Sequence, residues 1–278
     1  MKKLFPIIMV LLTAMAIGGV ILYSVRQNLA TGGEAPEIHF DQEQIDLETT
    51  SGESEMLRGV TATDKEDGDV TDSLLVENVS RFVDEDTVEV TYVAYDSQNH
   101  VSRAGRRVHF TDYTHPRFTF GAPMIFMSKN VNDMLNKVGA KDAMDGNISV
   151  KVHASFDDDS STLATVGVHN VEFSVTNSLG DTARILVPVR VVEDVTHTEL
   201  LPLKSYLVYL SRGAAFDAKS YLTNAEQAES VDKHGRNESY VEIKSTVDVS
   251  KSGVYAVDYN LIKNDTTTAT TRLIVVVD

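Results

Sequence analysis

From Pro36 onward, short runs of alternating apolar and polar residues fill the chain, separated by Gly, Asn and Asp. Valine, isoleucine, threonine and tyrosine dominate these runs, and apolar residues two positions apart share one face of a strand. No stretch after Arg26 shows the long 3.6-residue period that predicts an amphipathic helix. The pattern therefore predicts an all-β region built from half-buried antiparallel strands.

The N-terminal residues follow a different pattern. An almost unbroken apolar run extends from Leu4 to Val25, directly after Lys2 and Lys3. At about 1.5 Å per residue, a helix of this length spans the roughly 30 Å hydrocarbon core of a bilayer. The two lysines lie on the short side of the run, which predicts a cytoplasmic N-terminus and an exported C-terminal region.

We therefore expect a single-pass signal anchor in the cell membrane, with the C-terminal region extracellular. The alternative is a cleavable signal peptide followed by secretion, because Ala14-Met15-Ala16 has the small-x-small form of a cleavage site. The length of the apolar run favours the anchor. The predicted segments are residues 1–3 in the cytoplasm, residues 4–25 in the membrane and residues 26–34 as a linker.

The exported region repeats itself. Residues 57–71 align without gaps on residues 135–149, with the shared pattern D-x-x-D-G-[DN]-[VI]-[ST]. Downstream, alternating apolar positions precede Asp96-Ser97 in the first copy and Asn177-Ser178 in the second. A third copy keeps the alternating strand at residues 253–259 but lacks the D-x-x-D-G spacing. The first two copies lie 78 positions apart, from residue 57 to residue 135. A repeat of this length is too long for a solenoid unit and suits a small β-sandwich.

We accordingly predict three domains after the linker, with very short joins between them. Short joins limit bending, so we expect the domains to stand end to end as a stiff rod. The predicted fold is all-β, with three tandem immunoglobulin-like β-sandwich domains after a single N-terminal transmembrane helix. The predicted boundaries are residues 35–113 for domain 1, residues 114–193 for domain 2, and residues 194–278 for a divergent and distal domain 3.

The order of the motifs resembles a known family. Pro-x-apolar is followed by D-x-x-D-G-D-V-T, then V-x-V-x-Y-x-A-x-D-S, then a final strand. This order resembles the bacterial immunoglobulin-like repeats known as DUF5011, and is similar to the Ig-like module of a pesticidal crystal protein. The resemblance covers residues 35–278 and is closer in the first two copies than in the third. It implies a β-sandwich module on extracytoplasmic bacterial proteins, used as a spacer or a binding unit, with no enzymatic activity.

Composition and missing motifs narrow the function further. The chain has 278 residues, with 25 Lys and Arg against 41 Asp and Glu and a net charge of −16, so a nucleic-acid partner is not expected. Cysteine is absent, which excludes disulfides, thiolate zinc sites and cysteine nucleophiles. The sequence has no H-E-x-x-H, no G-x-S-x-G and no dinucleotide fingerprint. We therefore predict that the protein is not an enzyme, and we assign no catalytic residues.

The densest cluster of hard oxygen ligands follows the D-x-x-D-G pattern. Calcium takes six to eight oxygen ligands, so closely spaced carboxylates around a glycine turn are candidates for a calcium site. The competing interpretation is a structural turn, because Asp-Gly is a common turn dipeptide and the leading aspartate caps backbone donors. The second copy replaces several flanking acids with uncharged residues, so we favour the turn. The candidate metal ligands are Asp64, Asp67, Asp69, Asp142 and Asp145.

These features predict a non-catalytic, membrane-anchored bacterial cell-surface protein. Its Ig-like stalk is expected to present a protein- or glycan-binding tip, formed by residues 194–278, in adhesion or a related interaction. The alternative is a structural subunit or spacer of a cell-envelope assembly, which engages its neighbours through sandwich edges. No cofactor is expected, and calcium is the one candidate considered.

Overall fold

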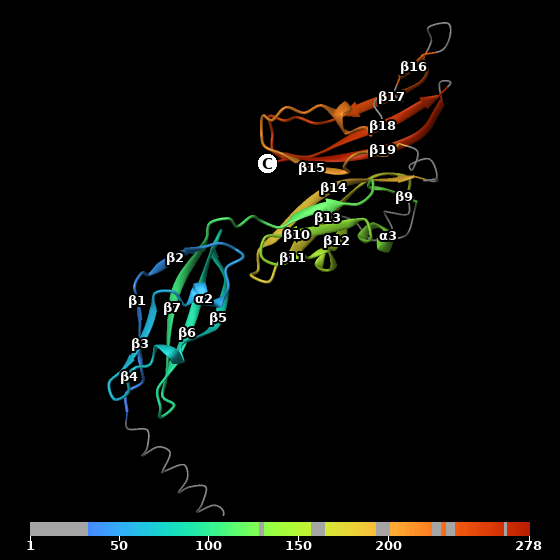
Figure 1. Cartoon of the computed structure of the whole chain (residues 1–278). Coiled ribbons are helices and arrows are strands. Elements are labelled where there is room, and N and C mark those ends of the chain that lie inside the picture. The colour runs from blue at the N-terminus through green and yellow to red at the C-terminus, as the bar shows by residue number, and fades with distance from the viewer. Residues whose placement is uncertain are drawn as a thin grey trace, which may run out of the picture. The chain divides into compact units, whose positions relative to one another are not determined.

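The computed structural model describes residues 33–127, 131–156, 165–192, 201–223, 229–231, 237–263 and 266–278. Almost all of the regular structure is β-strand, and the helices are single turns, among them α2 (Glu53–Met56) and α3 (Val131–Leu135). The prediction of an all-β chain is therefore confirmed. The chain divides into two compact units, Met1–Tyr113 and Thr114–Asp278, and each is described by itself (Figure 1).

Two sheets form the first unit. The smaller contains β1 (Glu37–Phe40), β3 (Val60–Asp64) and β4 (Gly68–Asp69), all antiparallel. The larger has the order β2 (Gln44–Leu47), β7 (Val101–Phe110), β6 (Thr87–Tyr95) and β5 (Leu75–Asp84), with β2 parallel to β7. The sheets meet where the ring of Phe40 packs 5.5 Å from the ring of buried Tyr92.

The first part of the second unit repeats this topology strand by strand. Its smaller sheet contains β8 (Arg117–Phe120), β10 (Val138–Asp142) and β11 (Gly146–Asn147). Its larger sheet has the order β9 (Ile125–Met127), β14 (Thr182–Val192), β13 (Gly167–Thr176) and β12 (His153–Phe156), with β9 parallel to β14. The internal repeat read from the sequence thus corresponds to a repeated fold.

The last segment keeps only part of the pattern. It has a five-stranded sheet in the order β15 (Leu207–Leu210), β19 (Thr266–Val277), β18 (Gly253–Lys263), β17 (Asn237–Ser245) and β16 (Glu229–Val231). The parallel pairing of β15 with β19 matches that of β2 with β7. Within the described residues, the smaller sheet is reduced to a single bridge between Leu203 and Leu222, beside the 3₁₀ turn Ala218–Tyr221. Whether this segment is a third independent domain stays a prediction.

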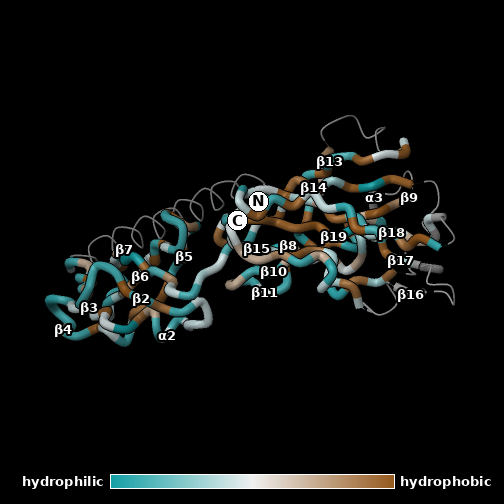
Figure 2. The backbone as a smooth tube through the Cα atoms, turned by 90° about the horizontal axis from the view of Figure 1, so that it is seen from above, coloured by the Kyte–Doolittle hydropathy of each residue, from teal (hydrophilic) through white to brown (hydrophobic). Residues whose placement is uncertain are grey.

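The second unit contains a hydrophobic cluster that joins its two parts. Val171 and Val187 of the second copy belong to the same buried cluster as Leu207, Ile274 and Val276 of the last segment. Figure 2 shows hydrophobic residues concentrated along β14, β18 and β19. Residues 273–277 are all buried, because their side chains point alternately to two different cores. The last two copies therefore pack against each other, and the expected end-to-end arrangement does not hold for them.

The prediction of a membrane anchor requires correction. Residues 4–25, to which it was assigned, lie outside the described residues. Across the ranges that the structure does describe, no helix combines the length and apolar character needed to cross a bilayer. The α-helices α2 and α3 have four and five residues, whereas a crossing takes about 20. The predicted location in the cell membrane is therefore not supported.

One histidine in the first unit gives a pH-dependent prediction. His109 of β7 lies opposite Asp46 of the parallel strand β2, with Nδ1 2.9 Å from its carboxylate, and Nε2 is 3.2 Å from Asp86. The hydrogen bond to Asp46 raises the pKa of His109, and the nearby charge of Asp86 adds to this against the opposing effect of burial. The ion pairs are partly exposed, so their contribution to stability is below about 1 kcal/mol.

Because the folded-state pKa is raised, the stabilisation from His109 is complete below its unfolded pKa of about 6.5. It is lost as the pH rises through the higher folded value. We expect the free energy of unfolding of the first unit to fall over this range, as measured by urea unfolding at a series of pH values. His109→Gln and Asp46→Asn should both flatten the profile. An unchanged profile in both variants would contradict the assignment.

Candidate functional site

The D-x-x-D-G motif forms a tight turn between β3 and β4. Oδ1 of Asp64 accepts hydrogen bonds from the backbone N–H groups of Glu66 and Asp67, at 2.8 and 2.9 Å. Gly68 has a φ of 77°, a left-handed conformation that favours glycine. Asp69 accepts from the N–H of Thr71 at 3.0 Å, and hydrogen bonding from the side chain and then the backbone of Thr71 lowers the pKa of Asp69. The motif therefore specifies a turn held by its own carboxylates.

A second loop, between β6 and β7, is held in the same way. Oδ1 of the buried Asp96 accepts from the N–H groups of Gln98 and His100, at 2.8 and 2.7 Å. Its Oδ2 lies 2.5 Å from Nδ1 of His100. Burial by itself would raise the pKa of Asp96, but the hydrogen bonds from His100 and Gln98 outweigh it and hold the pKa below its usual value. Asp96 is therefore held as a carboxylate.

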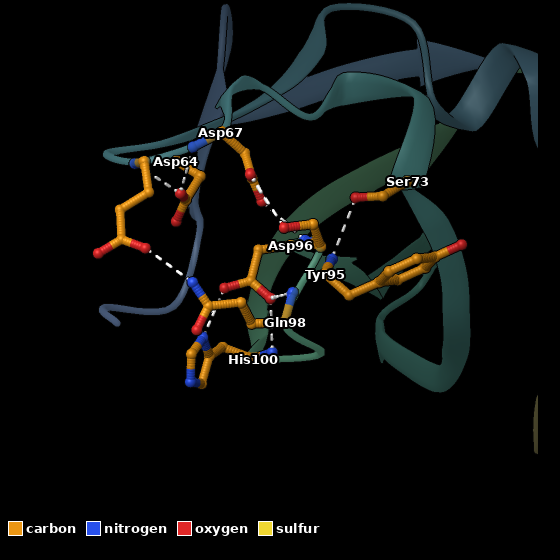
Figure 3. Close-up of polar contacts among 9 residues, drawn as sticks. Asp64, Asp67, Ser73, Tyr95, Asp96, Gln98 and His100 are labelled. Atoms are coloured by element: carbon orange, nitrogen blue, oxygen red, sulfur yellow. Dashed lines mark hydrogen bonds and ion pairs between the residues drawn. The ribbon is translucent and has the colours of Figure 1, made fainter. Parts of the chain in front are cut away.

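The two loops are joined to each other (Figure 3). The carboxylate of Asp67 accepts from the N–H of Ser97 at 2.7 Å and from its hydroxyl at 3.0 Å. The side-chain amide of Gln98 donates to Glu66 at 2.7 Å. As a result, the end of the small sheet is fixed against the β6–β7 hairpin by polar contacts.

The second copy builds the same pair of loops. Asp142 accepts from the N–H groups of Met144 and Asp145, at 2.9 and 2.8 Å. Asp145 accepts from the N–H and the hydroxyl of Ser178, at 2.8 and 2.6 Å. Lys151 also lies 2.8 Å from Asp145, and these contacts outweigh burial to lower the pKa of Asp145.

The copies differ at a position that bears directly on whether a cation fits. In the second copy, Asn177 donates from its amide to Asp142 at 3.1 Å. The first copy has Asp96 at the equivalent place, so carboxylates face one another there. One oxygen each from Asp64, Asp67 and Asp96 lies within 4.8 Å of the others, a spacing that can hold a metal ion.

Of the five residues predicted as metal ligands, the structure brings together Asp64 and Asp67. Asp69 binds Thr71 and lies outside the group, while Asp142 and Asp145 are paired with an amide and an ammonium group. Sequence reasoning missed Asp96 as a ligand. Its alignment with an asparagine in the second copy was the available signal.

If the motif is a structural turn, removing the hydrogen bonds that join its two loops should destabilise the fold. Asp145→Ala should lower the free energy of unfolding of the second unit by about 1–3 kcal/mol, because it leaves the N–H and hydroxyl of Ser178 without their acceptor. Asp67→Ala is the matched change in the first unit. Urea unfolding measures both. If each variant changes the free energy of unfolding by less than about 0.5 kcal/mol, the range of ordinary surface substitutions, these hydrogen bonds do not hold the loops together.

The same interpretation predicts the response to a chelator. The oxygens of Asp64, Asp67 and Asp96 already accept backbone N–H groups, which a cation would have to share. We therefore expect the melting temperature of the first unit to be the same in EGTA and in millimolar calcium. A rise with calcium that is abolished by Asp96→Asn would instead establish a cation site.

Comparison with known proteins assigns no family. No protein-family model matches the chain, so membership of DUF5011 stays a prediction. An uncharacterized 81.3 kDa protein of Acholeplasma phage L2 is 34% identical over 149 residues, which are 53% of this chain and 20% of that protein. The matched half of this chain therefore spans about a fifth of this relative's length.

Solved structures with some similarity include two from Clostridium perfringens ZmpB. One holds the M60 catalytic domain with CBM51-1 and CBM51-2 (13% identity, TM-score 0.20, 87% of this chain and 30% of that one). The other holds CBM51-2 in complex with GlcNAc and INT domains (15% identity, TM-score 0.23, 87% and 42%). The protocadherin GammaB4 extracellular domain is a third (10% identity, TM-score 0.19, 88% and 50%). TM-scores this low carry no argument about function.

Proposed function

We propose that this protein is a non-catalytic interaction protein, in which immunoglobulin-like β-sandwich modules hold a binding surface for a protein or glycan partner. The observation that carries the proposal is the loop pair that recurs in both copies. A catalytic acid or base needs a lone pair or proton directed at a substrate. Asp67 and Asp145 instead direct their carboxylates at Ser97 and Ser178.

The net charge of the chain and the rigidity of its modules support the same proposal. The chain carries a net charge of −16, which limits self-association and non-specific binding. Rigid sandwiches with fixed loops are suited to presenting a surface without rearrangement. The match of about half of this chain to one fifth of the phage protein supports a module that occurs in more than one protein.

A structural role is the alternative, supported by an exposed apolar face on the first unit. Leu75, Tyr95 and Val101 are 51%, 45% and 45% exposed. The strand register places them on one face of the larger sheet, because Leu75 lies opposite Val93 and Tyr95 opposite Val101. Such a face suits contact with a neighbouring subunit in an assembly.

Binding and sedimentation measurements on the full chain distinguish the two roles. We expect saturable binding to a defined glycan on an array or to a purified protein partner, with a monomer in analytical ultracentrifugation. Self-association that Tyr95→Ser abolishes, without any such binding, would overturn the proposal in favour of the assembly subunit. A monomer that binds nothing would overturn it in favour of a spacer.

A further inference from the structure

An open cleft of about 430 Å³ lies in the second unit, where the second copy meets the last segment. One wall is formed by the beginning of β13 and the end of β14, and the other by the end of β17 and the middle of β18 and β19. The same junction is closed and apolar further along β19, where Ile274 and Val276 join the shared core. The cleft is therefore the polar end of an otherwise packed interface, and its volume suits a small ligand or a few residues of a peptide.

The lining of the cleft is basic, although the chain as a whole is acidic. Arg190, Lys244 and Arg272 line it, and Asp258 is the one carboxylate among its described lining residues. Arg272 is buried, and its guanidinium is already paired. It donates to both oxygens of Asp258 at 2.6 and 2.8 Å and to the carbonyl of Pro188 at 2.8 Å. Lys244 lies 3.0 Å from Glu242.

Arg190 differs from these two cations. Its only polar side-chain contact among the described residues is a long one, 3.5 Å from Nη1 to the hydroxyl of Thr270. Within the described ranges, no carboxylate lies in ion-pair distance of its guanidinium. Val189 and Val191 point into the core of their own sandwich, so Arg190 points out of it toward the last segment. A partly buried guanidinium without an acidic partner is a ready site for an anion.

An apolar surface adjoins this guanidinium. Val168 lies opposite Arg190 in the register of β13 and β14, and it is 57% exposed. Val166, at the beginning of the same wall, is 60% exposed. A free phosphate would leave these two side chains in water. A carboxylate attached to an apolar group would cover them while it pairs with the guanidinium.

We propose that the cleft binds an organic carboxylate, with the carboxylate on Arg190 and its apolar substituent on Val166 and Val168. The proposal rests on the binding role proposed above and names a site and a ligand class for it. Two sources share this chemistry: a small free acid, and the C-terminal carboxylate of a peptide with an apolar last residue.

Titration of the full chain with matched probes tests the site. N-acetyl-leucine is compared with N-acetyl-leucinamide, and a pentapeptide ending in free leucine with its C-terminal amide, by calorimetry and by NMR of the valine methyl groups. We expect each acid to bind at least about tenfold more tightly than its amide, the loss expected for a charge-assisted contact. Whichever acid binds more tightly identifies the source.

Two arginine variants give the matched control. Arg190→Gln should weaken binding of the acid at least about tenfold, whereas Arg184→Gln should leave it unchanged. Arg184 lies on the same face of β14, is exposed and does not line the cleft. Equal binding of acid and amide, an equal effect of the two variants, or no binding at millimolar probe would each overturn the proposal.

The outcome is separable from that of the proposed function. If the acids fail to bind but the full chain still binds a glycan or protein partner, this cleft is not the site and the interaction role stands. If the acids bind in the predicted way while no macromolecular partner is found, the cleft is confirmed as a small-ligand site and the interaction role fails.

Discussion

Replacing Arg272 by methionine should lower the free energy of unfolding of the second unit by about 3 kcal/mol. The side chain of Arg272 is 5% exposed and its partner Asp258 is 22% exposed, so the change leaves a mostly buried carboxylate without its cation. It also leaves the carbonyl of Pro188, on the facing strand β14, without a donor. The substitution therefore removes a buried polar contact between the second copy and the last segment.

Urea unfolding measures the loss, and hydrogen exchange of the β18 amides locates it. The double variant Arg272→Met/Asp258→Leu should recover part of the stability, because it removes both charges together. Arg272→Lys keeps the charge but lacks the planar fork that places separate donors on both carboxylate oxygens and the carbonyl, so it should be intermediate. A loss below 1 kcal/mol in Arg272→Met would show that the buried pair adds little to the packing of β14 against the last sheet.

Replacing Arg106 by methionine should destabilise the first unit by about 3–4 kcal/mol. The side chain of Arg106 is fully buried and donates to the carbonyls of Met56 and Arg58 and to the hydroxyl of Tyr92. Its guanidinium also lies 5.4 Å from the ring centre of Phe40 and 5.3 Å from that of Tyr92. The change loses the cation–π contacts and the charged hydrogen bonds to both carbonyls, of which the Met56 carbonyl keeps the hydroxyl of Tyr92 as a donor.

The neighbouring Arg107 is a matched control. It lies on the same strand, its side chain is 50% exposed, and it pairs with the exposed Asp84. Arg107→Met should therefore cost less than about 1 kcal/mol. Hydrogen exchange of the β6 and β7 amides in the two variants makes the comparison. A similar loss of unfolding free energy for both variants would contradict the view that Arg106 stabilises the interior of the first unit.

The burial of Arg106 and Arg272 could not be predicted from the sequence. Arg106 occupies an inward position of β7, in line with Val108 and Phe110, and the alternation marks that position as core. Arginine is nevertheless expected at the surface, because a buried guanidinium needs hydrogen-bond partners. Two of the partners of Arg106 are backbone carbonyls 48 and 50 residues away in the chain, and only the folded chain brings them near.

The candidate site divides in a similar way. The turn at Asp64 and Asp67 was predictable, since an Asp side chain that binds the next N–H groups is a local interaction. The contribution of Asp96 was not, because it depends on the β6–β7 hairpin folding back onto the β3–β4 turn. The same long-range pairing places Asn177 on Asp142 in the second copy.

The sequence by itself determined the all-β class, the alternation that separates core from surface, the repeat of the first two copies, and the turns. These features depend on residues a few positions apart, whose effect on backbone conformation and strand faces is local. Only the tertiary structure decided that the last two copies share a core and leave a basic cleft at one end. The strand at residues 273–277 is buried on both faces, but a strand pattern does not say what covers its second face, because hydrophobic burial is not directional.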